Sequence, residues 1–284
     1  MTEQPTLVPL DGSRLSEAIL APILPLLRRR EQPVVLLRVV RPRGTAAEQS
    51  EALDIAQQRL DAATEALAAK GLRVSSRLER GQPADTILRV SKEVGAGLVA
   101  MATHGRSGAE RLVRGSVAER VLRECGVPLF LGNPLSMENK AEGDLFQRIL
   151  VPLDGSTLSD QILPIVMVLA LAYGSKVTLL RVHPIVYTEV PSPMLTGALW
   201  DEQAMRESLE KQRQSLADAG VEVEVRAVYG VEAAEILAAA DEADLVAMTT
   251  HGRSGFSRWW FGSVAESVAR HCPCPLLVRR TLED

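Results

Sequence analysis

The sequence contains the same motifs twice. Leu10-Asp11-Gly12-Ser13 recurs as Leu153-Asp154-Gly155-Ser156, and the hexapeptide Thr-His-Gly-Arg-Ser-Gly occurs at 103–108 and again at 250–255. An ungapped alignment of residues 101–132 with 248–279 has 18 identities in 32 positions. The repeat is much longer than the roughly 20–50 residues of solenoid units, so each copy should have its own hydrophobic core. We therefore predict a duplicated domain, with copies at 1–132 and 148–284 joined by a polar linker at 133–147.

Length and composition agree with this division and exclude several classes of protein. The chain has 284 residues, and at about 150 residues per domain this favours two domains. Apolar residues make up 46% and charged residues 24%, as in ordinary globular proteins. The net charge of −4, without a basic block, argues against a nucleic-acid partner.

Neither a membrane nor a secretory pathway is indicated. The first residues lack the cationic flank of a signal peptide. The longest apolar stretch, 162–173, is far shorter than the roughly 20 residues of a membrane span, and we interpret it as a buried helix face. Cys125, Cys272 and Cys274 form no C-x-x-C pair and fit small apolar packing residues in a reducing compartment. We predict a cytoplasmic protein.

Within each copy the hydrophobic pattern alternates between strand and helix. In the first copy it predicts strands at 7–10, 34–40, 72–78, 98–102 and 128–131, and helices at 13–30, 46–70, 84–94 and 116–123. Continuous apolar runs at 34–37 and 98–101 are typical of central parallel strands, whereas the Val/Glu alternation at 221–225 predicts an edge strand. The predicted fold is α/β, with two tandem Rossmann-like domains, each a five-stranded parallel sheet with helices on both faces. Such sheets bind ligands at the carboxyl ends of the strands, where the strand order reverses.

An acidic residue stands at the end of the first strand in each copy. Asp11 and Asp154 come directly before a Gly-Ser turn into a helix. One interpretation is helix capping, since Asp, Gly and Ser all favour helix starts. The other is a ligand contact at the carboxyl edge of the sheet, and the identical repeated context favours it.

A glycine-rich segment follows the fourth strand. Glycines let backbone N–H groups approach an anion, and Ser116 stands at the start of a helix, where free donors and a positive dipole end favour phosphate. A capping box between Ser116 and Glu119 is the structural alternative. Neither a P-loop nor a G-x-G-x-x-G fingerprint after the first strand is present. His104 and His251 have no acid or nucleophile at a catalytic spacing, so no catalytic or metal-binding set is predicted.

Together these motifs resemble those of the universal stress protein family, along nearly the whole of both copies, as in its tandem two-domain members. The resemblance implies a Rossmann-like fold of the adenine nucleotide hydrolase type that binds ATP, with or without Mg²⁺. The family motif is Gly-x-x-Gly, nine residues and Gly-Ser or Gly-Thr, but Ala102 and Thr249 replace its first glycine. The binding residues implied in the first copy are Pro9, Asp11, Val39, Met101, Ala102, Gly105, Gly115, Ser116 and Val117. Those implied in the second copy are Pro152, Asp154, Val182, Met248, Thr249, Gly252, Gly262, Ser263 and Val264.

The resemblance also implies a role as a nucleotide-dependent regulator in the stress response, with a protein partner, rather than as a dedicated catalyst. Members of the family commonly pair through the last strand, which implies intramolecular pairing of 129–131 with 276–278, and a homodimer is a further option. Two alternatives stay open: a slow Mg²⁺-dependent ATP hydrolase, and a dimerisation scaffold that binds no nucleotide. Because Thr249 is larger than Ala102 and β-branched, we expect unequal sites.

Overall fold

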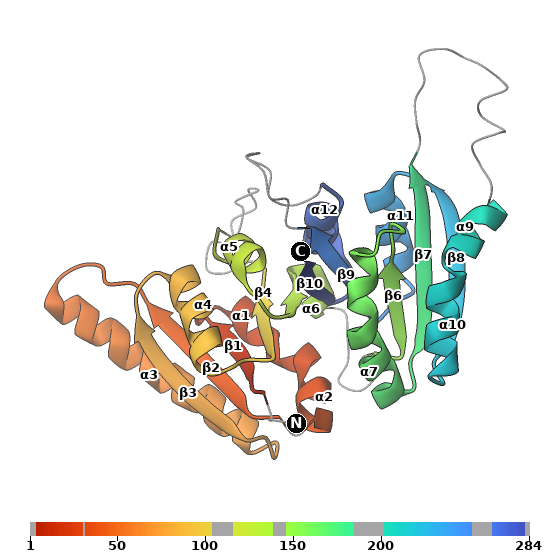
Figure 1. Cartoon of the computed structure of the whole chain (residues 1–284). Helices are drawn as coiled ribbons and strands as arrows, with labels where there is room; N and C mark the ends of the chain where they lie inside the picture. Colours follow the sequence, from red (N-terminus) through yellow and green to blue (C-terminus); the bar gives the residue numbers. More distant parts are fainter. Residues whose placement is uncertain are drawn as a thin grey trace, which may run out of the picture. The chain divides into compact units, whose positions relative to one another are not determined.

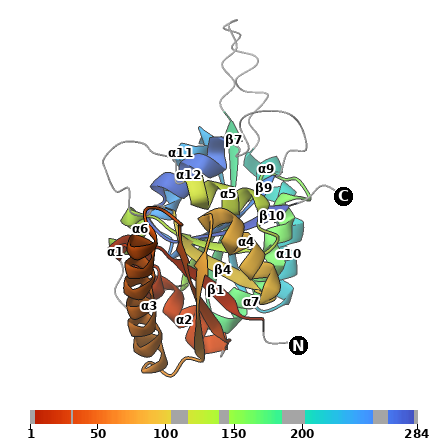
Figure 2. The same ribbon diagram turned by 90° about the vertical axis from the view of Figure 1, so that its left-hand side faces the viewer.

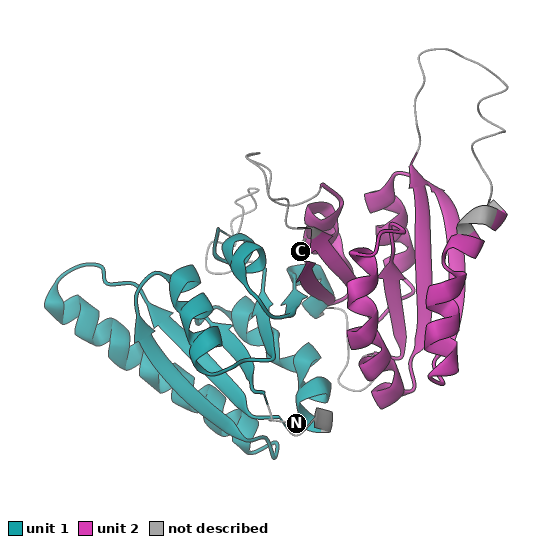
Figure 3. Ribbon diagram, in the orientation of Figure 1, with its two compact units in different colours: residues 1–143 teal, residues 144–284 magenta. Residues whose placement is uncertain are grey.

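The computed structural model describes residues 4–30, 32–103, 116–138, 146–184, 202–251 and 263–281. The chain divides into two compact units, residues 1–143 and 144–284 (Figure 3). Within the described residues, each unit contains a parallel sheet of five strands together with helices. The division falls inside the predicted linker, whose first residues form the short helix α6 (Pro134–Glu138).

In unit 1 the strands lie in the order β3-β2-β1-β4-β5 (Figure 1). The elements are β1 (Thr6–Leu10), α1 (Arg14–Ala18), α2 (Leu20–Arg30), β2 (Val34–Val40), α3 (Ala46–Ala68), β3 (Val74–Arg80), α4 (Pro83–Glu93), β4 (Leu98–Ala102), α5 (Ser116–Glu124) and β5 (Leu129–Gly132). Right-handed crossovers place α1 to α3 on one face and α4 and α5 on the other. The contact between α4 and α5, visible in Figures 1 and 2, agrees with this arrangement.

Unit 2 repeats this topology, with strand order β8-β7-β6-β9-β10. Its elements are β6 (Arg148–Pro152), the 3₁₀ helix η1 (Ser159–Ile162), α7 (Leu163–Tyr173), β7 (Lys176–Pro184), α9 (Glu202–Ser208), α10 (Glu210–Asp218), β8 (Glu222–Gly230), α11 (Glu232–Ala240), β9 (Leu245–His251), α12 (Ser263–His271) and β10 (Leu276–Thr281). The predicted edge strand, β8, lies at the end of the sheet order, beside β7. The predicted α/β, Rossmann-like fold class is confirmed.

The core of each unit lies between its sheet and the helices that cover it. In unit 1 the central strands contribute the fully buried Leu7, Leu36 and Leu37, and α2 contributes the fully buried Ile23 and Leu27. On α3, the buried residues are Ala56, Leu60 and Leu67, which recur at helical spacing along one face. Each unit therefore has the two-sided apolar sheet that the sequence pattern predicts.

One local prediction was wrong. The helix predicted at 13–30 is interrupted at Ile19, because Pro22 has no N–H to donate to the carbonyl of Ala18. The apolar stretch 162–173 has the predicted buried helix face, formed by Val166, Leu169 and Ala170 of α7, while Val168 and Leu171 on its other side are 53% and 52% exposed. Among the described helices, none has the length and apolar character needed to cross a membrane.

Candidate functional site

In each unit the strand order reverses between the first and fourth strands, and we call the carboxyl ends of these two strands the switch point. In the described register, β1 and β4 pair through Thr6–Leu98 and Leu7–Val99, whereas β1 and β2 pair along all of β1. In unit 2, β6 and β9 likewise pair at two amino-terminal positions. The strands therefore separate towards their carboxyl ends, which is where α/β sheets accept ligands.

The Asp-Gly-Ser turn at the switch point of unit 1 is held by its own polar groups. Ser13 N donates to Asp11 Oδ1 (2.8 Å), and Asp11 N donates to Ser16 Oγ (3.2 Å). Ser13 is the N-cap of α1, since its Oγ accepts from Ser16 N at 3.1 Å. The capping role considered for Asp11 thus belongs to Ser13, while Asp11 forms an Asx turn that places its carboxylate beside the end of β1.

Unit 2 repeats this geometry. Ser156 donates to Asp154 Oδ1 from both its N (2.9 Å) and its Oγ (2.6 Å), and Ser159 N donates to Ser156 Oγ (3.1 Å). Asp154 is exposed, whereas Asp11 is half-buried. The repeated motif therefore forms the same Asx turn twice, with a carboxylate after the first strand of each sheet, although an α-helix follows in unit 1 and a 3₁₀ helix in unit 2.

The neighbouring strand brings the predicted valine next to each carboxylate. Leu10 is the register partner of Arg38, so the residues that follow, Asp11 and Val39, lie side by side. In unit 2 the register partner of Pro152 is Leu180, which places Asp154 beside Val182. Both valines are half-buried.

Sequence reasoning missed an arginine beneath each turn. Arg38 is 8% exposed, and its Nη1 donates to the carbonyl oxygen of Leu10 at 3.1 Å. Its guanidinium fills the space under Gly12, where an added Cβ would lie 2.8 Å from Nη1. A second arginine, Arg59 of α3, donates to the carbonyl oxygen of Gly12 at 2.8 Å. Two guanidinium groups therefore hold the backbone around the Asp11 carboxylate.

The corresponding arginine of unit 2 is Arg181. Its Nη1 donates to the carbonyl oxygen of Leu153 at 3.4 Å, and an added Cβ on Gly155 would lie 2.6 Å from it. The signal was present in the sequence, because Leu-Leu-Arg-Val occurs at 36–39 and again at 179–182. An arginine that recurs inside an otherwise apolar strand indicates that the side chain has a specific role at that position.

The position of the replaced family glycine differs between the units. Ala102 is the register partner of Gly132, against which Ile19 packs. Thr249 is the register partner of Arg279, whose Nη1 donates to the carbonyl oxygen of Gln161 at 3.2 Å. At this position of the switch point, unit 1 therefore has two small residues, Ala102 and Gly132, whereas unit 2 has the larger Thr249 and the cationic Arg279.

The remaining predicted residues divide into described and undescribed ones. Met101 and Met248 are buried in the fourth strands. Pro9 is the residue before the last in β1, and Pro152 is the last residue of β6. Ser116 and Val117 begin α5, and Ser263 and Val264 begin α12, with both serines exposed. Four predicted glycines lie outside the described residues: Gly105, Gly115, Gly252 and Gly262. Within the described part of the chain, no group of three or more His, Cys, Asp or Glu residues is placed to hold a metal ion.

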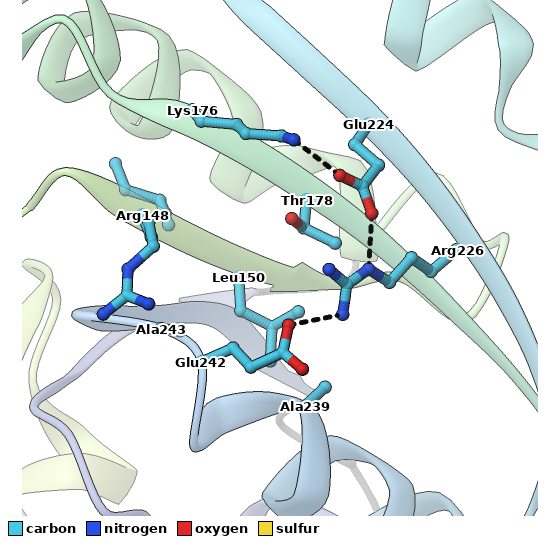
Figure 4. A pocket seen from close by; sticks show the side chains of 10 residues that line it. Arg148, Leu150, Lys176, Thr178, Glu224, Arg226, Ala239, Glu242 and Ala243 are labelled. Atoms are coloured by element: carbon cyan, nitrogen blue, oxygen red, sulfur yellow. Dashed lines mark hydrogen bonds and ion pairs between the residues drawn. The ribbon is translucent and has the colours of Figure 1, made fainter.

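A pocket of about 270 Å³ lies elsewhere in unit 2, near the amino ends of β6, β7 and β8 (Figure 4). Four of its charged lining residues pair with one another: Lys176 Nζ lies 2.7 Å from Glu224, and Arg226 contacts both Glu224 and Glu242, the latter at 3.0 Å. The hydrogen bond from Lys176, and then that from Arg226, lowers the pKa of Glu224. This pocket is at the opposite end of the strands from Asp154 and is not part of the switch point.

Two doubly wound parallel sheets, each with an acidic turn and a helix start at its switch point, define a tandem Rossmann-like protein. The family model for the universal stress protein family matches residues 4–131 and 145–280. The chain therefore belongs to the universal stress protein family, and the resemblance found in the sequence is confirmed.

Individual relatives agree with this assignment. The chain is 30% identical over 141 residues to a universal stress protein of Methanocaldococcus jannaschii, covering 48% of this chain and 82% of the relative. It is 29% identical over 143 residues to one of Thermus aquaticus, covering 48% of this chain and all of the relative. The crystal structure of a universal stress protein from Archaeoglobus fulgidus has the same tandem fold, with a TM-score of 0.77, 22% identity and 99% coverage of both chains.

Proposed function

We propose that each unit binds one ATP at its switch point, and that the protein is a nucleotide-dependent regulator in the stress response rather than a dedicated catalyst. The observation that carries this proposal is the acidic turn, closed by the same serine N–H to aspartate hydrogen bond at Asp11 and at Asp154, at the point where the neighbouring strands separate. Membership of the universal stress protein family supports it. A carboxylate held at this edge of the sheet can accept hydrogen bonds from the hydroxyl and amine donors of adenosine.

The other residues of the switch point fit the remaining parts of the nucleotide. Val39 and Met101 offer apolar surface to a base in unit 1, as do Val182 and Met248 in unit 2. The starts of α5 and α12 present backbone donors and a positive dipole end, which suit a phosphate chain. Arg38, beside the carboxylate, offsets part of the negative charge that a triphosphate brings.

Isothermal titration calorimetry of the full chain with ATP tests the proposal. We expect saturable binding at submillimolar ATP, with a stoichiometry of up to two. Ligand at about 100 times Kd should also raise the free energy of unfolding by about 2.7 kcal/mol, which a thermal shift detects. Absence of heat and of any thermal shift would refute nucleotide binding and leave the scaffold alternative.

The variants Asp11→Asn and Asp154→Asn separate the charge of the site from its structure. Asparagine keeps the Oδ1 acceptor, so the turn hydrogen bonds from Ser13 and Ser156 persist. Loss of a charged hydrogen bond should weaken ATP binding at the altered site by about tenfold or more. Asp54→Asn, on the exposed surface of α3, is the matched control and should change nothing. Equal affinity in all three variants would contradict the proposed role of the turn.

A phosphate-release assay distinguishes binding from hydrolysis. We expect no release above background. Release that follows protein purity and disappears when Asp11 and Asp154 are both changed to alanine would replace this proposal with a slow Mg²⁺-dependent hydrolase.

The proposal includes an assembly and a location. We propose that β5 and β10 pair across a pseudo-twofold within one chain, that any homodimer is additional to this pairing, and that the protein acts in the cytoplasm on a protein partner. Apolar side chains at Leu129 to Leu131 and Leu276 to Val278 support the pairing. Sedimentation of the full chain over a range of concentrations tests the homodimer, since a sedimentation coefficient independent of concentration would exclude self-association.

A further inference from the structure

Two thiols of unit 2 lie in contact at the end of α12. Cys272 follows the last residue of that helix, Pro273 lies in a bend, and Cys274 precedes Pro275 and β10. The two Sγ atoms are 3.6 Å apart, and the residues are 0% and 1% exposed. A disulfide requires about 2.05 Å, so the sulfur atoms need to approach by about 1.5 Å. Pro273 has a fixed φ, which limits the conformations of the chain between the two cysteines.

The duplication supplies an internal reference. At the same place in unit 1, after α5, the sequence is Cys125-Gly126-Val127-Pro128, so one thiol is kept and valine replaces the second. Cys125 is 2% exposed, as buried as the two cysteines of unit 2, but the residue two positions after it is Val127, so it has no adjacent thiol with which to form a disulfide. Unit 1 shows that the segment between the last helix and the last strand folds with one cysteine and one valine, so the fold does not require the second thiol.

We propose that Cys272 and Cys274 are a redox-active dithiol that a hydroperoxide oxidises to an intramolecular disulfide. One of the two sulfur atoms, as its thiolate, attacks one peroxide oxygen, the O–O bond breaks, and the alcohol or water leaves with a proton. The second sulfur then attacks the sulfenic acid on the first, the S–S bond forms, and the released hydroxyl leaves as water with the proton of the second thiol. The two sulfur atoms together give up two electrons, which reduce the peroxide. Because both thiols are buried, the rate is set by local opening of 272–275.

The test is exposure of the folded full chain to hydrogen peroxide, followed by intact mass and peptide mapping without reductant. We expect a loss of about 2 Da, a peptide with Cys272 joined to Cys274, recovery of the thiols with dithiothreitol, and an unmodified Cys125. The result does not depend on ATP binding, so failure of the nucleotide proposal leaves it standing.

Cys274→Val, which copies unit 1, is the matched variant. It should keep its circular dichroism spectrum and lose the 2 Da product (about two hydrogens) while Cys125 stays unmodified. The wild-type protein provides a second measurement, because phenylarsine oxide binds only closely spaced dithiols and should bind once per chain. The proposal is overturned if peroxide gives only sulfinic acid, if all three cysteines react alike, or if the disulfide forms only in unfolded protein.

Discussion

Replacing Gly12 with alanine tests whether the acidic turn is built on Arg38. Gly12 has a φ of +75°, and a Cβ there would lie 2.8 Å from Arg38 Nη1. The left-handed backbone costs an alanine about 1–2 kcal/mol. Displacing Arg38 removes its charged hydrogen bond to Leu10, worth about 1.5–3 kcal/mol. We expect Gly12→Ala to lower the free energy of unfolding of unit 1 by about 2.5–5 kcal/mol.

Gly71→Ala is the matched control. Gly71 has a φ of +84° but nothing within 4 Å of an added Cβ, so this variant carries only the backbone cost, about 1–2 kcal/mol. The gain from a less flexible unfolded chain is the same in both variants and cancels in the comparison. The expected difference between them is therefore about 1.5–3 kcal/mol.

The assay is urea unfolding of the full chain with two probes. All three tryptophans, at 200, 259 and 260, belong to unit 2, so their fluorescence reports on that unit, while far-ultraviolet circular dichroism reports on both. Gly12→Ala should shift the circular dichroism transition more than the fluorescence transition. In an Arg38→Met background the cost of Gly12→Ala should fall to that of Gly71→Ala. Equal costs for the two glycines in the wild-type background would refute the contact with Arg38.

Two further predictions concern the asymmetry of the sites and the response to acid. Thr249→Ala should tighten ATP binding at the second site and Ala102→Thr should weaken it at the first, and unchanged calorimetric fits for both would contradict the steric argument. Lys176 and then Arg226 lower the pKa of Glu224 below its ordinary 4.5, so its stabilising contribution is present above pH 4.5 and is lost as the pH falls through the lower folded value. Glu224→Gln should therefore flatten the acid side of the unit 2 stability profile followed by tryptophan fluorescence, whereas Glu207→Gln, an exposed control in α9 of the same unit, should leave it unchanged.

The sequence predicted most of the fold because its strong periodicity is repeated. The boundaries it missed follow from local chemistry. The strand predicted to start at Leu72 starts at Val74, because Leu72 N donates to the carbonyl oxygen of Leu67 (3.4 Å) and completes the helix end over Gly71. Val221 N donates to Leu216 O in the same way, at 3.1 Å. An apolar residue after a glycine therefore looks like a strand in the pattern but belongs to the helix cap.

Features of the site that depend on contacts across the fold were not visible in the pattern. Arg38 is separated from Gly12 by 26 residues, and only the pairing of β1 with β2 brings its guanidinium under the turn. The proximity of Cys272 and Cys274 depends on the bend at Pro273, which sequence spacing alone did not predict. In both cases the two copies had to be compared with each other. The comparison shows that the arginine occurs in both units and that the second thiol occurs in unit 2 alone.

The arginine beneath the turn links stability to the proposed binding function. Burying a guanidinium is costly, and apolar residues of similar volume often serve stability as well or better. Arg38 is 8% exposed and Arg181 is half-buried, and the presence of an arginine under the acidic turn in both units is better explained by the proposed nucleotide site than by stability alone. If so, Gly12→Ala should perturb stability and ATP affinity together. Gly71→Ala should perturb stability alone and Asp11→Asn affinity alone, because only at Gly12 do the backbone of the turn and the guanidinium occupy the same space.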